Sequence, residues 1–512
     1  MNGRAAFSPL RRLIMNEEAK RILEDVKSLK VQVLDDGQKL LDQWSESNTR
    51  SSYSDSLRNL AYYMAFRQYD HREIQNNLIP WGVSSLGRIE PHVLSNLDSV
   101  IKTLGYITGH EQDDVSYPEY QDGENRYSML KHNTDLLLGK GPEIRQSQIM
   151  VTMPSDAATD YQLVKDLIDS GMNTARINCA HDDSSVWKKM IHNIKQAAKE
   201  GNTECRILMD ISGPKVRIKN LLTSKRNPKL KTGESFLLSN EDAMTLPANI
   251  EIAVNTSVPE VLKNIDVGQL IKIDDGQVEA KVTEVLDSGL ILKVTKVTKE
   301  NGVKIKTEKG INFPDVDIDL NVLTEKDLVD LDFASQHADL IAFSFVKSKE
   351  DMAFIESVLQ DKLPDDNKDM PIIAKIETVE AIKEFPNIIA EAASHRPFGV
   401  MLARGDLAVE IGYERLSEIQ EELLWICEAA HIPMIWATQV LESLIKNGIP
   451  TRSEISDVVA GARAECIMLN KGDYIVEGVK TVNDILIKSE DHNYKKTAML
   501  RALNISKALF NE

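Results

Sequence analysis

Pro371-Ile372-Ile373-Ala374-Lys375-Ile376-Glu377 is a short apolar run that ends in charge, and Ala403-Arg404-Gly405-Asp406 follows about thirty residues later with the same pattern. Alternate side chains of a strand share a face, so we expect Lys375 and Glu377 to point the same way. Asp406 follows the next predicted strand, which would bring two carboxylates and an amine together at one sheet edge. Such a cluster suits a magnesium ion and a developing oxyanion; the alternative is a solvated ion pair.

The chain after Gln146 alternates between short β-rich runs and amphipathic helical stretches. The predicted strands are 149–153, 174–178, 205–210, 339–344, 371–377, 398–403, 433–438 and 465–469. Most neighbouring strands are separated by one predicted helix, among them 158–170, 185–200, 325–336, 349–359 and 415–430. Eight strands alternating with helices predict an α/β fold, a closed parallel (β/α)8 TIM barrel over residues 146–218 and 309–512.

Polar side chains gather where these predicted strands end. They are Arg176, Asn178, Asp210, Ser344, Lys375, Glu377, Asp406 and Thr438. The active sites of such barrels lie at the carboxyl ends of the strands, so we expect the functional site there. Lys375 is the least ambiguous member, because a lysine inside a barrel mouth is costly unless it has a partner or a function.

A second, smaller domain interrupts the barrel after its third strand. More than a hundred residues separate Asp210 from Asp339, and their interior contains β-rich runs at 233–238, 270–273, 278–285 and 290–297. Asp274-Asp275-Gly276 is a strong hairpin signal. We therefore predict a small β-barrel domain over residues 219–308, named here the lid, which would exclude water from the site. A decorative insertion is the alternative.

Residues 1–145 are predicted to form an N-terminal helical accessory region for packing or assembly. Helical spacing extends over 17–44, 53–68 and 91–104, and the polar stretch 109–125 is predicted to be a loop. The first fifteen residues carry Arg4, Arg11 and Arg12 and no acid. This composition allows an organelle-targeting segment or a frayed basic terminus in a cytoplasmic protein.

Composition argues against a general nucleic-acid-binding protein, a membrane-spanning protein and a disulfide-rich protein. The 512-residue chain has a formal net charge of −18, which argues against general nucleic-acid binding but not against a local phosphate site. No apolar run is long enough to span a membrane. The four scattered cysteines contain no CxxC pair, which fits buried thiols in a reducing compartment.

Several motifs, in this order along the chain, resemble those of the pyruvate kinase family over about residues 149–486. They are Gly171-Met172-Asn173-Thr174-Ala175-Arg176-Ile177-Asn178, Asp210-Ile211-Ser212-Gly213-Pro214-Lys215-Val216-Arg217, Lys309-Gly310-Ile311-Asn312-Phe313-Pro314, Lys375-Ile376-Glu377, Ala403-Arg404-Gly405-Asp406-Leu407 and Ala437-Thr438-Gln439-Val440-Leu441-Glu442-Ser443. Any one motif is weak, but their joint order around an inserted β domain is specific.

The resemblance implies the glycolytic transfer of a phosphoryl group from phosphoenolpyruvate to ADP, giving pyruvate and ATP. Glu377 and Asp406 would hold Mg²⁺ or Mn²⁺, and Lys375 would neutralise charge that develops on the phosphoryl group and the enolate oxygen. Arg176 would clamp the phosphate. The Gly405 and Asp406 amides would bind the substrate carboxylate together with the Thr438 hydroxyl. Such a site works mainly by positioning and charge neutralisation.

By the same resemblance, Asn178, His181 and Arg217 would face the nucleotide phosphates. Each site residue also has a purely structural interpretation. Arg176 can pair with an acid at a strand end, and Thr438 can cap the following helix. Asn178 can hold a loop, and His181 can be a surface histidine.

The chain departs from the family at its monovalent-cation site. Many members bind K⁺ through an asparagine and a serine after strand two and an aspartate and a threonine after strand three. Asn178 and Asp210 remain here, but Ala180 and Ile211 supply no such oxygen. Lys215 stands where K⁺-dependent members have a glutamate, and its ammonium group can supply the missing charge. The resemblance with this change predicts an enzyme that does not require K⁺.

Two further departures lie near the carboxyl end. The Gly-Glu-Thr-Ala loop that usually follows the eighth strand is missing, so Met468-Leu469-Asn470 continues directly into Lys471-Gly472-Asp473. That loop lies near the proposed route of proton delivery to the enolate. Only some twenty-five residues follow the eighth barrel helix, so we expect a homo-oligomer that does not use the family's C-terminal regulatory domain.

Two other functions remain open from the sequence. A magnesium-dependent lyase of the related phosphoenolpyruvate/pyruvate barrels would use the same acids, but it would not explain the lid or Arg217. A non-catalytic relative that binds phosphoenolpyruvate or a nucleotide would explain the altered eighth-strand loop. The intact Lys375, Glu377, Asp406 and Thr438 argue against that second alternative.

Overall fold

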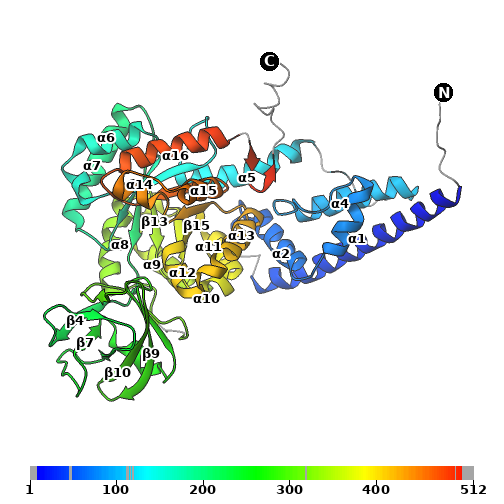
Figure 1. Cartoon of the computed structure of the whole chain (residues 1–512). Helices are drawn as coiled ribbons and strands as arrows, with labels where there is room; N and C mark the ends of the chain where they lie inside the picture. The colour runs from blue at the N-terminus through cyan, green and yellow to red at the C-terminus, as the bar shows by residue number, and fades with distance from the viewer. Residues whose placement is uncertain are drawn as a thin grey trace.

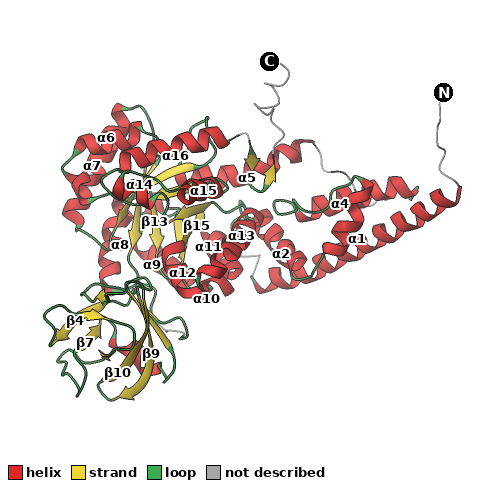
Figure 2. Cartoon of the chain, in the orientation of Figure 1, coloured by secondary structure: helices red, strands yellow, loops and turns green. Residues whose placement is uncertain are grey.

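The computed structural model describes residues 9–44, 49–110, 115, 117, 120–316, 320–490 and 492–498 (Figure 1). A helix-covered barrel forms the body, the lid projects from one of its ends, and an N-terminal group of helices extends to the other side (Figure 2). Arg4 and parts of the predicted loop 109–125 lie outside the described residues. No helix in the described part of the chain is long and apolar enough to cross a bilayer.

The closed parallel barrel predicted from the sequence is confirmed. Its strands are β1 (Gln148–Thr152), β2 (Thr174–Asn178), β3 (Arg206–Ile211), β13 (Leu340–Phe343), β14 (Ile372–Ile376), β15 (Phe398–Ala403), β16 (Met434–Ala437) and β17 (Cys466–Leu469). They close in the order β1-β17-β16-β15-β14-β13-β3-β2. Each predicted strand matches within one residue at either end. Parallel strands buried on both faces are continuous apolar runs, which makes them easy to locate.

Helices cover the outside of the barrel. They are α6 (Tyr161–Asp169), α7 (Ser184–Glu200), α8 (Glu325–His337), α9 (Lys349–Lys362), α10 (Val379–Lys383), α11 (Phe385–His395), α12 (Arg404–Ile411), α13 (Tyr413–Ala429), α14 (Glu442–Asn447), α15 (Arg452–Gly461) and α16 (Ile475–Ser489). Capping boxes begin three of them, with Thr324, Ser348 and Thr451 as N-caps. Each box satisfies backbone N–H groups that the first helical turn leaves unpaired.

The lid is built from the residues between β3 and α8. Its strands are β4 (Ile218–Thr223), β5 (Lys229–Leu230), β6 (Ser235–Ser239), β7 (Ile252–Thr256), β8 (Leu270–Ile273), β9 (Val278–Leu286), β10 (Gly289–Val297), β11 (Val303–Lys304) and β12 (Ile311–Asn312). Seven of them form one sheet in the order β12-β8-β9-β10-β6-β7-β4. This sheet is open between β12 and β4, so the lid is a curled sheet rather than the closed small barrel that the sequence suggested.

The lid contacts the barrel through α12, the helix that begins with Arg404. Lys272 on β8 donates a hydrogen bond to the Val409 carbonyl oxygen. Asn312 on β12 donates from Nδ2 to Glu410 Oε1 at 2.9 Å. The lid therefore packs on α12, which follows the carboxyl end of β15, where site residues were expected.

The N-terminal region is helical, as expected, with more helices than the sequence predicted. It contains α1 (Pro9–Gln43), α2 (Ser54–Arg67), α3 (Arg72–Leu78), α4 (Val93–Thr108) and α5 (Tyr120–Leu138). The predicted loop 109–125 is wrong over its last residues, because α5 already begins at Tyr120. The polar sequence of α5 hides this helix, whose end is ordered by tertiary packing.

The end of α5 closes the amino-terminal mouth of the barrel. Leu137 and Leu138 are buried in one cluster with residues from the barrel strands, including Met150, Ile373 and Met401. A Cβ atom added at Gly399 would lie 2.3 Å from Leu137 Cδ2, so α5 fits against β15 where that strand has no side chain. The N-terminal region is thus part of the barrel's core and not a detachable appendage.

Polar contacts attach α2 and the segment before α4 to the turn that follows the barrel helix α13. The buried His431 ring contacts Ser56 Oγ at 2.9 Å through Nδ1 and the Pro91 carbonyl oxygen at 3.0 Å through Nε2. A hairpin of β18 (Asn493–Tyr494) and β19 (Thr497–Ala498) adds Lys496, which pairs with the buried Glu90. Its neighbour Lys495 pairs with Glu465.

Glu428, the residue before the last one of α13, is expected to make the folded chain less stable as pH rises. Burial raises its pKa to about 7, against the attraction of Lys495 and with repulsion from Glu90. The folded chain therefore binds this proton more tightly than the unfolded chain. The proton on Glu428 contributes its full stabilisation of the folded chain below the pKa that Glu428 has in the unfolded chain. This stabilisation is lost as pH rises towards about 7, which lowers the free energy of unfolding by about 3 kcal/mol.

Glu428→Gln should therefore increase stability at about pH 8 and change it little at about pH 5. Urea denaturation at both pH values would measure the difference from the wild-type chain. Glu422→Gln, at an exposed position of α13, is the matched control. An equal effect of Glu428→Gln at both pH values would contradict this assignment.

Candidate active site

The carboxyl ends of the barrel strands surround a cavity of about 370 Å³. The predicted site residues that line it are Arg176, Asn178, Lys215, Arg217, Lys375, Glu377, Asp406 and Thr438. Asp275, from the lid turn between β8 and β9, also lines it, so the lid reaches the cavity. Asp274 and Asp275 adopt φ values of 57° and 52°, as the hairpin signal required.

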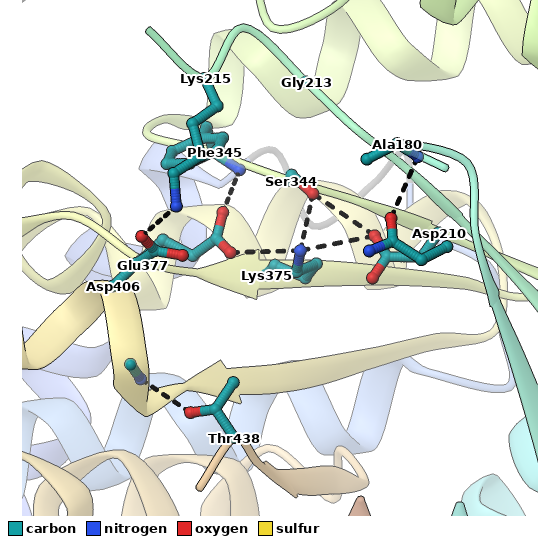
Figure 3. A network of polar contacts seen from close by, with 12 residues as sticks. Ala180, Asp210, Gly213, Lys215, Ser344, Phe345, Lys375, Glu377, Asp406 and Thr438 are labelled. Atoms are coloured by element: carbon teal, nitrogen blue, oxygen red, sulfur yellow. Dashed lines mark hydrogen bonds and ion pairs between the residues drawn. The ribbon is translucent and has the colours of Figure 1, made fainter. Parts of the chain in front are cut away.

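Lys375 lies at the centre of the polar network in this cavity (Figure 3). Its Nζ is 3.2 Å from Glu377 Oε1 and 3.4 Å from Asp210 Oδ1, and it donates to Ser344 Oγ at 2.7 Å. Burial alone would lower the pKa of Lys375, but the Asp210 and Glu377 carboxylates outweigh burial and raise it. The lysine therefore stays protonated inside the barrel mouth.

Arg176 and Asp210 join strands β2 and β3. Arg176 donates from Nε to Asp210 Oδ2 at 2.7 Å and from one terminal nitrogen to Thr152 Oγ1 at 2.7 Å. Burial would raise the pKa of Asp210, but Lys375 and Arg176 hold it below its ordinary value. Arg176 thus pairs with an acid at a strand end, which was the structural interpretation of this residue. Its guanidinium has five N–H donors, so some remain available to bind a phosphate.

Glu377 is held by the backbone of a neighbouring strand end. The Phe345 N–H donates to Glu377 Oε2 at 2.7 Å, and Phe345 has a φ of 58°. Left-handed backbone at a bulky residue is strained and typical of functional sites. Burial raises the pKa of Glu377, and Asp406 adds to that effect despite the opposing charge of Lys375.

Lys215 pairs with Asp406, at 2.5 Å between Nζ and Oδ1. Lys215 comes from the lid stem after β3, and Asp406 is in the first turn of α12. The ammonium predicted to replace a monovalent cation therefore lies in the cavity beside an expected metal ligand. Asn178 accepts instead from the Ala180 N–H at 3.1 Å, which matches its loop-holding interpretation.

The Thr438 hydroxyl accepts from the Gly405 N–H at 2.7 Å. Thr438, Gln439 and Leu441 have φ values of 66°, 57° and 49°, so a strained turn follows β16. The Gly405 amide and the Thr438 hydroxyl, both expected at the substrate carboxylate, therefore lie together.

Arg404 holds this turn, a role that the sequence did not suggest. It donates from Nε to the Ala437 carbonyl oxygen at 3.0 Å and pairs with Asp457 at 2.5 Å. Its guanidinium also lies over the Trp436 ring, 4.4 Å from the centroid. Asp457 is 53 residues away along the chain, so no local pattern could have indicated the pair.

Glu377 and Asp406 are two carboxylates of this cavity that could hold a divalent cation. Within the described ranges, no three or more His, Cys, Asp or Glu side chains gather to hold a metal. Glu377 and Asp406 lie close together in the cavity (Figure 3). Mg²⁺ typically takes one or two carboxylates and completes its shell with water and substrate oxygens.

A second cavity of about 320 Å³ adjoins the first, and Arg176, Asn178 and Asn470 line both. His181 lies in this second cavity. Burial lowers the pKa of His181, and the charge of Lys471 lowers it further. Arg217 donates to the Glu308 carbonyl oxygen at 3.0 Å, which joins the two stems of the lid.

Comparison with known proteins agrees with this architecture. Residues 144–479 match the family model described as "Pyruvate kinase, barrel domain". The Clostridium perfringens pyruvate kinase is 35% identical over 359 residues, covering 68% of this chain and 72% of that protein. The Geobacillus stearothermophilus enzyme is 35% identical over 354 residues, covering 68% of this chain but 57% of its own length.

A solved structure gives the same result. The crystal structure of a pyruvate kinase from Cryptosporidium parvum superposes with a TM-score of 0.60 at 28% identity. The match covers 69% of this chain and 72% of that one. The barrel, the interrupting lid and the sequence matches all lead to one conclusion: this chain belongs to the pyruvate kinase family of enzymes.

Proposed function

We propose that this cavity transfers the phosphoryl group of phosphoenolpyruvate to ADP, producing pyruvate and ATP. The observation that carries the proposal is the buried Lys375 ammonium, held between two carboxylates below the lid. A buried ammonium fixed in the cavity stabilises negative charge that develops on a reacting oxygen. The lid turn at Asp275 would help to exclude water during the transfer.

Each residue then has a distinct role. Arg176 binds the phosphate with the N–H groups that Asp210 and Thr152 leave available. The Thr438 hydroxyl and the Gly405 and Asp406 amides bind the substrate carboxylate. Asn178, His181 and Arg217 face the nucleotide. Glu377 and Asp406 would hold Mg²⁺ or Mn²⁺, which would supply further charge neutralisation at the transferring group.

A coupled assay for pyruvate tests the reaction. Full-length protein with phosphoenolpyruvate, ADP and Mg²⁺ should form pyruvate and ATP in equal amounts, and omission of ADP should stop both. Pyruvate formed without ADP would favour the lyase. Binding of phosphoenolpyruvate without turnover would favour the non-catalytic relative. Either result would reject the proposed transferase.

We also propose that the reaction does not require K⁺. Lys215 places a positive charge in the cavity, whereas Ala180 and Ile211 offer no side-chain oxygen to a cation. The rate should be the same in potassium chloride and in tetramethylammonium chloride of equal ionic strength. Strong stimulation by potassium would contradict this proposal.

The oligomeric state of the protein is a separate question from its reaction. We propose that the protein is a homo-oligomer. Light scattering on the intact chain would measure its mass. A monomer over the working concentration range would reject the proposal.

A further inference from the structure

The side chain of Arg404 holds the backbone around Thr438, a residue that lines the cavity. Arg404 donates from Nε to the Ala437 carbonyl oxygen at 3.0 Å and from Nη2 to the Thr438 carbonyl oxygen at 2.8 Å. These two carbonyl groups belong to the peptide units on either side of the Thr438 Cα atom. One guanidinium therefore fixes the direction in which the Thr438 side chain leaves the backbone.

Asp457 on α15 fixes this guanidinium in turn. Its Oδ1 accepts from Nη1 of Arg404 at 2.5 Å, and its Oδ2 accepts from Nη2 at 2.9 Å. A bidentate pair sets the plane of the guanidinium as well as its position. Arg404 is buried, and Asp457 lies outside the described lining of both cavities. The Asp457 carboxylate therefore acts on the turn through Arg404.

The helix that carries Asp457 packs directly on strand β16. A Cβ atom added at Gly461 would lie 2.6 Å from Trp436 Cδ1, so the end of α15 fits against the Trp436 ring where the helix has no side chain. The Arg404 guanidinium also lies on this ring, 4.4 Å from its centroid. Packing therefore fixes the position of Asp457 relative to the turn that follows β16.

The turn depends on such support, because its backbone is strained. Thr438 has a φ of 66°, which is a costly conformation for a β-branched residue and persists only where the surroundings hold it. In this conformation the Thr438 hydroxyl accepts from the Gly405 N–H at 2.7 Å. Without the bonds from Arg404 the turn should relax, and the hydroxyl should leave its place beside the Gly405 amide.

We propose that Asp457 is a positioning residue for the substrate carboxylate, because through Arg404 it holds the Thr438 hydroxyl where that carboxylate binds. This inference rests on the proposed function, which assigns the carboxylate to Thr438 and to the Gly405 and Asp406 amides. Asp457 itself touches no reacting atom. It should therefore affect ligands that carry the carboxylate and leave the nucleotide unaffected.

Titration calorimetry on the full chain with Mg²⁺ tests the inference without turnover. Asp457→Asn should raise the Kd for pyruvate about tenfold, the effect of losing one hydrogen bond to a charged group, and leave the Kd for ADP unchanged. Asp457→Glu should restore most of the pyruvate affinity, because it restores the charge opposite Arg404. In steady-state assays Asp457→Asn should raise KM for phosphoenolpyruvate more than it lowers kcat, since the carboxylate is bound both before and during the transfer.

Arg404→Lys tests the same link from its other end. A lysine keeps the charge opposite Asp457, but its compact ammonium lacks the fork that reaches two carbonyl oxygens and a carboxylate together. It should therefore cause the same selective loss of pyruvate affinity. Asp332→Asn is the matched control, since it removes the exposed partner of Lys362 on α8, away from the turn. Melting temperatures of all variants would verify that each one folds.

Two results would overturn the inference. One is an unchanged pyruvate affinity in either Asp457→Asn or Arg404→Lys. The other is an equal loss of affinity for pyruvate and ADP, which would indicate general damage to the barrel. If Asp457→Asn selectively weakens pyruvate binding but the wild-type protein forms no pyruvate from phosphoenolpyruvate, this inference stands and the proposed transferase fails.

Discussion

Lys375→Met should lower kcat by about 10²- to 10³-fold while the protein remains folded. The lost ammonium is the buried positive charge next to Asp210 and Glu377, and methionine fills a similar volume without charge. The charge matters most when the phosphoryl group is in transfer, so kcat should fall much more than the affinity for phosphoenolpyruvate. Steady-state kinetics of pyruvate formation would measure both.

Lys383→Met provides the control for the charge change. Lys383 is exposed at the end of α10, close in sequence but outside the cavity. Its kinetics should equal those of the wild-type protein. Full activity of Lys375→Met, or a proportional loss of kcat in both variants, would remove Lys375 from the proposed chemistry.

Asp210→Ala should destabilise the protein by about 3–5 kcal/mol and abolish activity. Asp210 is buried, and its carboxylate faces both Arg176 at 2.6 Å and Lys375 at 3.4 Å. Removing it leaves two buried cations without their common partner, which costs much more than the pair itself contributes. Urea denaturation followed by circular dichroism would measure the loss.

The control is an exposed ion pair on the surface. Asp484→Ala removes the exposed partner of Lys488 on α16, where N and O are 4.0 Å apart. Its effect should be below about 1 kcal/mol, because water screens exposed charges. A loss of similar size in both variants would show that the Asp210 network adds no special stability.

The barrel was predictable because burial on both faces makes each of its strands a continuous apolar run. The meeting of Lys375 and Glu377 was predictable for a different reason, the two-residue period of a strand. Lys375 and Glu377 share a strand face by the period of two, and their 3.2 Å contact confirms that expectation.

Helices that depend on tertiary packing were less predictable. The predicted loop 109–125 overlaps the start of α5, because the sequence of this helix is polar and has a weak helical period. Leu137 and Leu138, which are buried against residues of the barrel strands, stabilise the last turn of α5. Removal of residues 1–145 would therefore expose the barrel interior in addition to any oligomer interface.

The sequence by itself determined the barrel, the place of the lid and the residues that meet at the strand ends, since these depend on local periodicity and chain order. Only the tertiary structure decided the partners of the charges. Lys215 with Asp406 and Arg404 with Asp457 join residues that are 191 and 53 positions apart. The strength of such pairs depends on distance and burial, which no spacing along the chain specifies.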